Sequence, residues 1–191
     1  MKFRDLISLI SDDLVRYGAQ GFWGGVRAYV FIPGFYCTFW YRICEWRKES
    51  LLRRILLYPA IIFRRRSHRI WHTVIAGTIG GGLCVGHAEG GGIIINGNVK
   101  IGRNCNIHHG VTIGARNRSA SGLELGTPEI GDNVYIGPGA KVFGGIKIGN
   151  NVAIGANAVV THDIPDNAVV GGVPAKIISY SGSEGLISRR V

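Results

Sequence analysis

The hydrophobic positions of residues 130–165 repeat with a period of six. An aliphatic side chain, usually followed by glycine, opens each unit, at Ile130, Ile136, Val142, Ile148, Ile154 and Val160. This period matches neither the turn of an α-helix nor the simple alternation of a strand. It is typical of a parallel β-helix, in which each unit forms one side of a three-sided coil. We therefore expect stacked aliphatic pairs inside the prism, with Gly and Asn at its corners: Ile130 over Ile148, Ile136 over Ile154, and Val142 over Val160.

The same pattern extends back to about Ile75 and is interrupted twice. Its earlier units open at Ile79, Val85, Ile95, Ile101, Ile107 and Ile113. The period slips across HAEGGG (87–92), and it is lost across 115–129, a polar loop insertion. Because functional residues gather on loops that a rigid scaffold carries, a site is expected at these interruptions.

Residues 1–71 have a different pattern, which predicts helices. The first 18 residues place apolar side chains on one side and acids on another, as an amphipathic helix does. The uncharged stretch 28–41 is shorter than the roughly 20 residues of a spanning helix, and it contains Pro33-Gly34. We expect three parts: a helical region over 1–71, the β-helix over 72–178 with the loop insertion 115–129, and a C-terminal tail over 179–191.

Composition supports this division and suggests a partner for the first part. Most of the 30 glycines follow residue 72, whereas all four tryptophans and most of the net charge of +10 precede it. A basic, aromatic helical region is typical of proteins that lie on anionic lipid, which predicts a peripheral position on the inner face of the plasma membrane. The alternative is a helical subdomain packed on the barrel or on a neighbouring subunit. No nucleic-acid-binding motif accompanies the basic charge, so nucleic acid is not expected as a partner.

The cysteines and the N-terminal sequence indicate the compartment. The four cysteines show no CxxC spacing, which argues against a disulfide framework or a zinc site and favours a reducing cytoplasm. The sequence MKFRDLISLISDD has acidic residues directly after a short apolar stretch, so no signal peptide is expected.

Histidines near the first interruption are candidates for chemistry. His87 lies within it, and a histidine can remove a proton from a hydroxyl as that oxygen attacks a carbonyl. A surface corner residue without this role is the alternative. His108 and His109 are adjacent on a coil, so they are expected to point to opposite faces. One of them could line a subunit interface or a thioester site, and simple corner packing is the other interpretation.

Several stretches of the repeat region carry a family resemblance. They are VGHAEG, IHHGVTIG, the run IGPGAKVFGGIKIGNNVAIGANAVV and the closing IPDNAVVGGVPAKII. Over 72–178 they resemble the hexapeptide acyltransferases of the serine O-acetyltransferase type, and among these the short polysaccharide-biosynthesis members similar to colanic acid O-acetyltransferases. The resemblance implies a mainly β fold, a left-handed parallel β-helix that is an exception to the right-handed crossover rule. It also implies a homotrimer that binds acetyl-CoA between adjacent barrels and needs no metal.

The resemblance assigns roles to individual residues. His87 matches the family's catalytic histidine and would deprotonate the acceptor hydroxyl, which then attacks the acetyl thioester directly. A backbone N–H near Gly114-Ala115 would stabilise the oxyanion. The positions that match the family's coenzyme contacts are Gly114, Ala115, Ala140 and Ala156, with Lys141 and Lys176 as partners for the CoA phosphates.

Three departures from the serine enzymes bear on the acceptor. His72 stands where they carry the Asp that orients the catalytic histidine, and Gly86 stands where they carry an Asp next to it. Gly126 and Thr127 stand where they carry an Arg-His pair that helps to hold the amino acid. Candidates to orient His87 instead are Glu89 and, from the loop, Glu124 or Glu129; candidates for substrate contact are His109, Glu124 and Thr127.

These departures, together with the basic helical region, favour a sugar hydroxyl over serine. The sequence thus predicts an acetyl-CoA-dependent O-acetyltransferase of surface-polysaccharide biosynthesis, acting on a possibly lipid-linked glycan. The first alternative is serine O-acetylation in cysteine biosynthesis. The second is a protein of another class, either a β-helix scaffold without activity or a carbonic-anhydrase-like protein with zinc on shared histidines.

Overall fold

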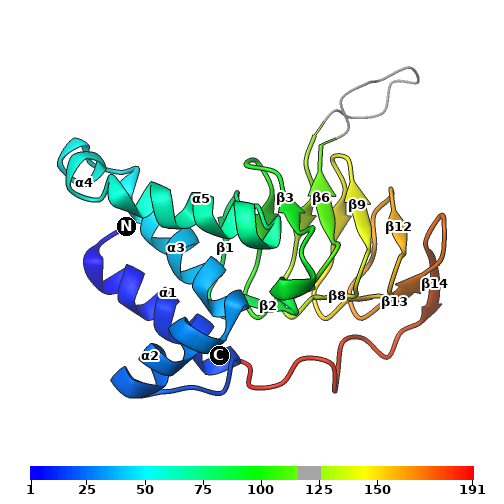
Figure 1. The fold of residues 1–191 in the computed structure, drawn as a ribbon. Helices are drawn as coiled ribbons and strands as arrows, with labels where there is room; N and C mark the ends of the chain where they lie inside the picture. Colours follow the sequence, from blue (N-terminus) through cyan, green and yellow to red (C-terminus); the bar gives the residue numbers. More distant parts are fainter. Residues whose placement is uncertain (116–125) are drawn as a thin grey trace.

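The computed structural model describes residues 1–115 and 126–191, and every structural statement below concerns these residues. Helices gather at one end of the molecule, and the strands form coils that are stacked away from them (Figure 1). Pro33 and Pro59 each occupy the first position of a helix, where a missing N–H costs nothing. The helices are α1 (Phe3–Arg16), α2 (Gly21–Phe31), α3 (Pro33–Arg47), α4 (Leu51–Leu56) and α5 (Pro59–Trp71).

The strands of the described residues build the three faces of a prism. The first face is β1 (Thr78–Ile79), β4 (Lys100–Ile101), β7 (Glu129–Ile130) and β10 (Lys147–Ile148). The second is β2 (Cys84–Gly86), β5 (Asn106–His108), β8 (Tyr135–Ile136), β11 (Ala153–Ile154), β13 (Val169–Gly171) and β14 (Lys176–Ser179). The third is β3 (Ile94–Ile95), β6 (Thr112–Gly114), β9 (Lys141–Phe143) and β12 (Val159–Val160). The chain visits the faces in turn, and among the described strands only β13 and β14 pair antiparallel.

Strand register confirms the predicted stacking of aliphatic residues. Ile136 pairs with Ile154, Ile148 with Ile130, and Val160 with Val142. These side chains belong to one continuous buried core that fills the prism. A period of six in the sequence therefore becomes three parallel sheets around an aliphatic interior.

Three corners join the faces, and we name each by its contents. The asparagine corner (80–83, 102–105, 131–134, 149–152 and 165–168) joins the first face to the second. The His87 corner (87–93, 109–111, 137–140 and 155–158) joins the second to the third. The loop corner (96–99, 115, 126–128, 144–146 and 161–163) joins the third back to the first.

The asparagine corner explains the recurrence of Asn in the repeats. Asn104, Asn133 and Asn151 all have positive φ, near 55°, which side chains other than Asn and Gly rarely tolerate. Their amides form a ladder across the coils, with Asn133 Nδ2 donating to Asn151 Oδ1 at 3.0 Å and Asn151 Nδ2 to Asn167 Oδ1 at 3.1 Å. The prediction of Asn at strained corners is confirmed.

The C-terminal tail returns along this corner toward the helices (Figure 1). Ser183 donates its amide to Asn151 O at 2.9 Å and its hydroxyl to Asn133 O at 2.6 Å. At the end of the chain, the Val191 amide donates to Asn104 Oδ1 at 2.8 Å. The tail therefore bridges several coils of the β-helix.

Helices α1 and α3 are attached to the first coil by buried polar contacts. Arg42 of α3 pairs with Asp13 of α1 and donates to the carbonyls of Ile79 and Gly80. Asp13 in turn accepts the Leu83 amide at 2.9 Å. None of the described helices is both long and apolar enough to cross a bilayer.

Candidate functional site

His87 lies at the turn that follows β2, where the second face ends. Its backbone is in the left-handed region, with φ 53° and ψ 46°, an uncommon conformation that clusters at functional sites. The side chain is 69% exposed, and Nδ1 lies 3.5 Å from Glu89 Oε1. The neighbouring Ala88 is fully buried and fixes the turn in the core. This geometry presents an imidazole to solvent with a carboxylate on one side.

Two further imidazoles flank His87. The ring centroid of His108 lies 6.0 Å from that of His87, and the ring centroid of His109 lies 6.2 Å from it. The expectation that His108 and His109 point to opposite faces is therefore wrong. His108 ends β5, but His109 lies in the turn beyond, where the alternation of a strand no longer applies.

The glycines beside His87 leave room for these two rings. A Cβ atom on Gly86 would lie 2.9 Å from Cε1 and Nδ1 of His108. A Cβ atom on Gly90 would lie 3.0 Å from Cγ of His109. Each imidazole thus lies against a glycine, and an Asp at position 86 could not coexist with the present place of the His108 ring.

The two flanking rings are half-buried and carry unpaired nitrogens. Nδ1 of His108 and Nδ1 of His109 are buried, and neither has a hydrogen-bond partner in the described residues. The His108 ring also packs on Tyr135, at 5.0 Å between centroids. Burial, with His87 and His109 next to it, lowers the pKa of His108. His108 is therefore a neutral imidazole at pH 7.

The cysteine nearest to His87 in the sequence is Cys84, and it is not available as a thiolate. Cys84 lies in β2, three positions before His87, and burial raises the pKa of its thiol. The thiolate is the nucleophilic form of cysteine, so Cys84 is not poised for attack at neutral pH.

The His87 corner also carries several of the predicted coenzyme contacts. Ala156 is exposed there, whereas the Ala140 methyl is fully buried in the core. The Lys141 ammonium donates to Gly110 O and, at 3.2 Å, to Thr112 Oγ1. Lys176 is exposed in β14, just past the last turn of this corner. A continuous edge of the barrel thus runs from His87 past Ala156 to Lys176.

The remaining predicted residues lie on other parts of the prism. Gly114 and Ala115 lie at the loop corner with Thr127, whose hydroxyl donates to Asn98 O at 2.9 Å. Glu129 lies on the first face and binds Lys100 at 2.6 Å, which lowers its pKa. Within one protomer, neither Thr127 nor Glu129 is placed at the His87 corner. Glu124 lies outside the described residues, as does most of the loop insertion 115–129.

His72 lies close to the His87 corner and brings no carboxylate to it. It ends α5 in a left-handed conformation, with φ 48°. A Cβ atom on Gly91 would lie 2.8 Å from Trp71 O and 3.8 Å from the His72 Cβ. Among the described residues near His87, Glu89 is the carboxylate in contact with its ring. No three His, Cys, Asp or Glu side chains in this part of the chain are grouped to hold a metal ion.

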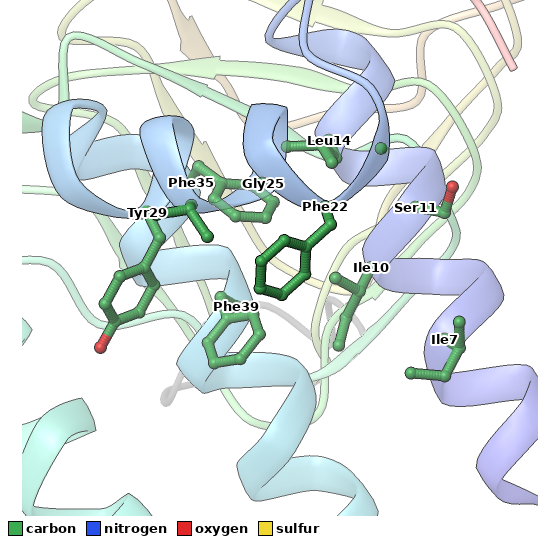
Figure 2. A pocket seen from close by; sticks show the side chains of 11 residues that line it. Ile7, Ile10, Ser11, Leu14, Phe22, Gly25, Tyr29, Phe35 and Phe39 are labelled. Atoms are coloured by element: carbon green, nitrogen blue, oxygen red, sulfur yellow. The ribbon is translucent and has the colours of Figure 1, made fainter.

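A large apolar hollow lies elsewhere on the described surface. It has a volume of about 690 Å³ and lies between α1, α2 and α3, with Phe22, Phe35, Phe39 and Ile10 in its wall (Figure 2). His87, His108 and His109 are not among its lining residues. The hollow therefore belongs to the exposed apolar surface of the helices and is separate from the site at His87.

Comparison with known proteins identifies the type of chain. Residues 127–162 match the bacterial transferase hexapeptide (six repeats) family. The fold and this match together define a protein built on hexapeptide repeats.

Several relatives of the chain are serine acetyltransferases. The serine acetyltransferase of Mycobacterium tuberculosis is 36% identical over 151 residues, which is 78% of this chain and 62% of the relative. The serine acetyltransferase of Brucella abortus in complex with coenzyme A is 28% identical, with a TM-score of 0.75 over 94% of this chain and 70% of that one. That of Neisseria gonorrhoeae in complex with serine is 28% identical, with a TM-score of 0.68 over 91% of this chain and 69% of that one. The chain spans about three fifths of the length of the curated relative.

These relatives correct the predicted acceptor. The expectation of a polysaccharide O-acetyltransferase, closest to the colanic acid enzymes, is wrong, because the likeness over most of the chain is to serine acetyltransferases. The error came from weighing single departures, at His72, Gly86 and Gly126, above the overall likeness. Sequence reasoning assigned no definite role to His108. The signals that could have pointed to it were its position next to His109 and the glycines around His87.

Proposed function

We propose that this chain is an acetyl-CoA-dependent O-acetyltransferase whose acceptor is the hydroxyl of serine. Support comes from its likeness to serine acetyltransferases, including structures with coenzyme A and with serine. The observation that carries the chemistry is the exposed His87 imidazole, held at a left-handed turn with Glu89 beside its Nδ1.

The proposed reaction is a direct transfer. His87 Nε2 takes the proton of the serine hydroxyl as the oxygen attacks the thioester carbonyl, and Glu89 stabilises the imidazolium that forms. The tetrahedral intermediate collapses, the C–S bond breaks, and the leaving thiolate takes the proton from His87. The products are O-acetylserine and free CoA. A backbone N–H near Gly114-Ala115 is proposed to bind the oxyanion.

We propose that the coenzyme lies along the exposed edge of the barrel and that the working unit is a homotrimer. Ala156 and Lys176 continue the edge that begins at His87, whereas Gly114 and Ala115 lie across the third face at the loop corner. A groove between two protomers would bring the His87 corner of one to the loop corner of the other. Ala140 and Lys141 would then contribute through the backbone, since the Ala140 methyl is buried and the Lys141 ammonium is bound to Gly110 O.

The division of the chain and the sense of its coils are part of this proposal. We assign residues 1–71 to a helical region, 72–178 to the acyltransferase domain and 179–191 to a tail that binds back on the coils. We assign a left-handed sense to the coils. The superposition on serine acetyltransferases over more than nine tenths of the chain supports both assignments.

The test is an assay with acetyl-CoA and L-serine. The purified chain should release free thiol and form O-acetylserine, seen by mass spectrometry. His87→Ala should lower kcat by about 10²- to 10⁴-fold, the usual contribution of a general base. His68→Ala is the matched control, because His68 lies in α5, outside both corners of the proposed groove, and its replacement should leave the rate unchanged. Acetylation of other hydroxyl compounds but not of serine would overturn the acceptor, and full activity of His87→Ala would overturn the mechanism.

We also propose that the helical region contacts an anionic membrane surface from the cytoplasmic side. Large apolar side chains are exposed on α2 and α4, for example Trp23 at 79% and Leu51 at 73%. Arg65 and Arg66 are exposed on α5 in the same helical region, where they could bind lipid phosphate. The apolar hollow of Figure 2 lies in the same helical region.

Vesicle flotation tests this contact. The chain should float with vesicles that contain phosphatidylserine and much less with pure phosphatidylcholine. Leu52→Glu/Ile55→Glu should abolish flotation, whereas Ile177→Glu, which changes an exposed apolar residue of β14, should not. Equal recovery of all three proteins with both lipids would overturn the proposal.

A further inference from the structure

The His87 corner brings together three histidines, His87, His108 and His109, whereas a general base requires only one. The ring centroids of His108 and His109 lie 6.0 and 6.2 Å from that of His87, and the mechanism uses only His87. Gly86 and Gly90 leave the space that the other two rings fill. The arrangement has a cost in free energy, because two buried ring nitrogens have no hydrogen-bond partner in the described residues.

The unpaired nitrogens fix where the protons lie. A buried N–H without an acceptor costs more than a buried lone pair, so the proton of each flanking ring belongs on the other nitrogen. Nδ1 is the buried atom in both His108 and His109. Since both rings are only half-buried, Nε2 is the nitrogen on the open side. Each flanking ring therefore offers an N–H donor outward.

His87 has the opposite arrangement. Its Nδ1 faces the Glu89 carboxylate at 3.5 Å, which favours the proton on Nδ1 and leaves the Nε2 lone pair free. One ring that accepts a proton thus lies near two rings that donate hydrogen bonds. An amino-acid acceptor presents complementary groups: a hydroxyl that loses a proton, and a carboxylate that needs donors.

We propose that His108 and His109 bind the carboxylate of the acceptor amino acid through their Nε2–H groups, while His87 acts on its hydroxyl. This inference rests on the proposed function, since it takes serine as the acceptor. The Lys141 ammonium, a possible alternative donor at this corner, is already bound to Gly110 O and Thr112 Oγ1. The two histidines are specificity residues, because they select an acceptor that carries a carboxylate.

The test compares serine with serinamide, which keeps the hydroxyl and the amine but lacks the negative charge. The wild-type chain should prefer serine, measured as kcat/KM, by about 10- to 100-fold, the range for hydrogen bonds to a charged group. In His108→Leu and His109→Leu this ratio should fall toward one, mainly through a higher KM for serine. His108→Gln and His109→Gln, which keep an N–H donor near the position of Nε2, should retain most of the preference.

Controls separate this inference from the proposed function. His68→Leu, in α5, should keep the wild-type ratio, and the KM for acetyl-CoA should stay within about twofold in the His108 and His109 variants, since the coenzyme is not their ligand. If the wild-type chain acetylates serine and the Leu variants keep the full preference for serine over serinamide, the carboxylate role is overturned and the proposed function stands. If the wild-type chain does not acetylate serine, both fail together. Circular dichroism of each variant establishes that it folds.

Discussion

Asp13 and Arg42 are joined by two hydrogen bonds of 2.9 Å in a place where both side chains are almost completely removed from water. The pair connects α1 with α3, and each partner also binds the backbone of the first coil. The contact therefore determines how the helical region sits on the β-helix.

Removal of one partner from this pair should be strongly destabilising. Asp13→Ala leaves the Arg42 guanidinium buried without its counter-charge, and we expect a loss of about 3–5 kcal/mol in the free energy of unfolding. Denaturant titration followed by tryptophan fluorescence measures this loss. Substitution of the exposed Lys100, whose pair with Glu129 lies in water, should change stability little. Equal stability of the wild type and Asp13→Ala would contradict the structural role.

Gly86→Ala should displace the His108 ring. The new methyl would lie 2.9 Å from the imidazole, which is closer than the two groups can approach, so the ring must move. We expect a lower preference for serine over serinamide together with a small loss of stability. Gly24→Ala, in α2, is the matched control, because a Cβ there makes only an ordinary contact, 3.5 Å from Ala19. Normal discrimination by Gly86→Ala would show that the place of the His108 ring does not matter.

The asparagine ladder should be sensitive to backbone strain as well as to hydrogen bonding. Asn151→Ala puts an unfavourable side chain at φ 56° and removes two amide contacts, and we expect a loss of about 2–3 kcal/mol. Asn151→Gly relieves the strain and loses only the contacts, so about half that loss is expected. Thermal unfolding of the two variants separates the contributions. If both are equally stable, strain at the corner is not significant.

Stability should fall on acidification because of His108. Burial lowers the pKa of this imidazole from the ordinary value of 6.5, so below that pH the unfolded chain binds a proton that the folded chain does not. The free energy of unfolding therefore rises with pH between the folded-state pKa and 6.5 and is level above it. His108→Gln should reduce this slope. Denaturation midpoints at a series of pH values between 5 and 8 measure the effect. An unchanged slope in His108→Gln would contradict the assignment.

The sequence predicted the prism because its signal is periodic and local. Each six-residue unit carries its own aliphatic residue and corner residue, so the spacing alone was enough to pair Ile136 with Ile154. The helical region and the position of His87 at a corner followed in the same way, from amphipathic spacing and from a break in the period.

The arrangement around His87 could not be predicted, because it depends on contacts between successive coils. The alternation rule placed His108 and His109 on opposite faces, but the turn after β5 brings both rings to His87. That Gly86 makes room for the His108 ring is likewise visible only when β2 lies beside β5. The acceptor was also misjudged, since single residues that differ from a family pattern say less than the likeness of the whole domain.

The C-terminal tail changes how this stack can come apart. In a solenoid, each layer touches only its neighbours, so the open end can fray one layer at a time. Here Ser183 holds the coils of Asn133 and Asn151, and Val191 holds the coil of Asn104. These contacts oppose fraying of the coils that they join, and they therefore favour cooperative unfolding of the prism.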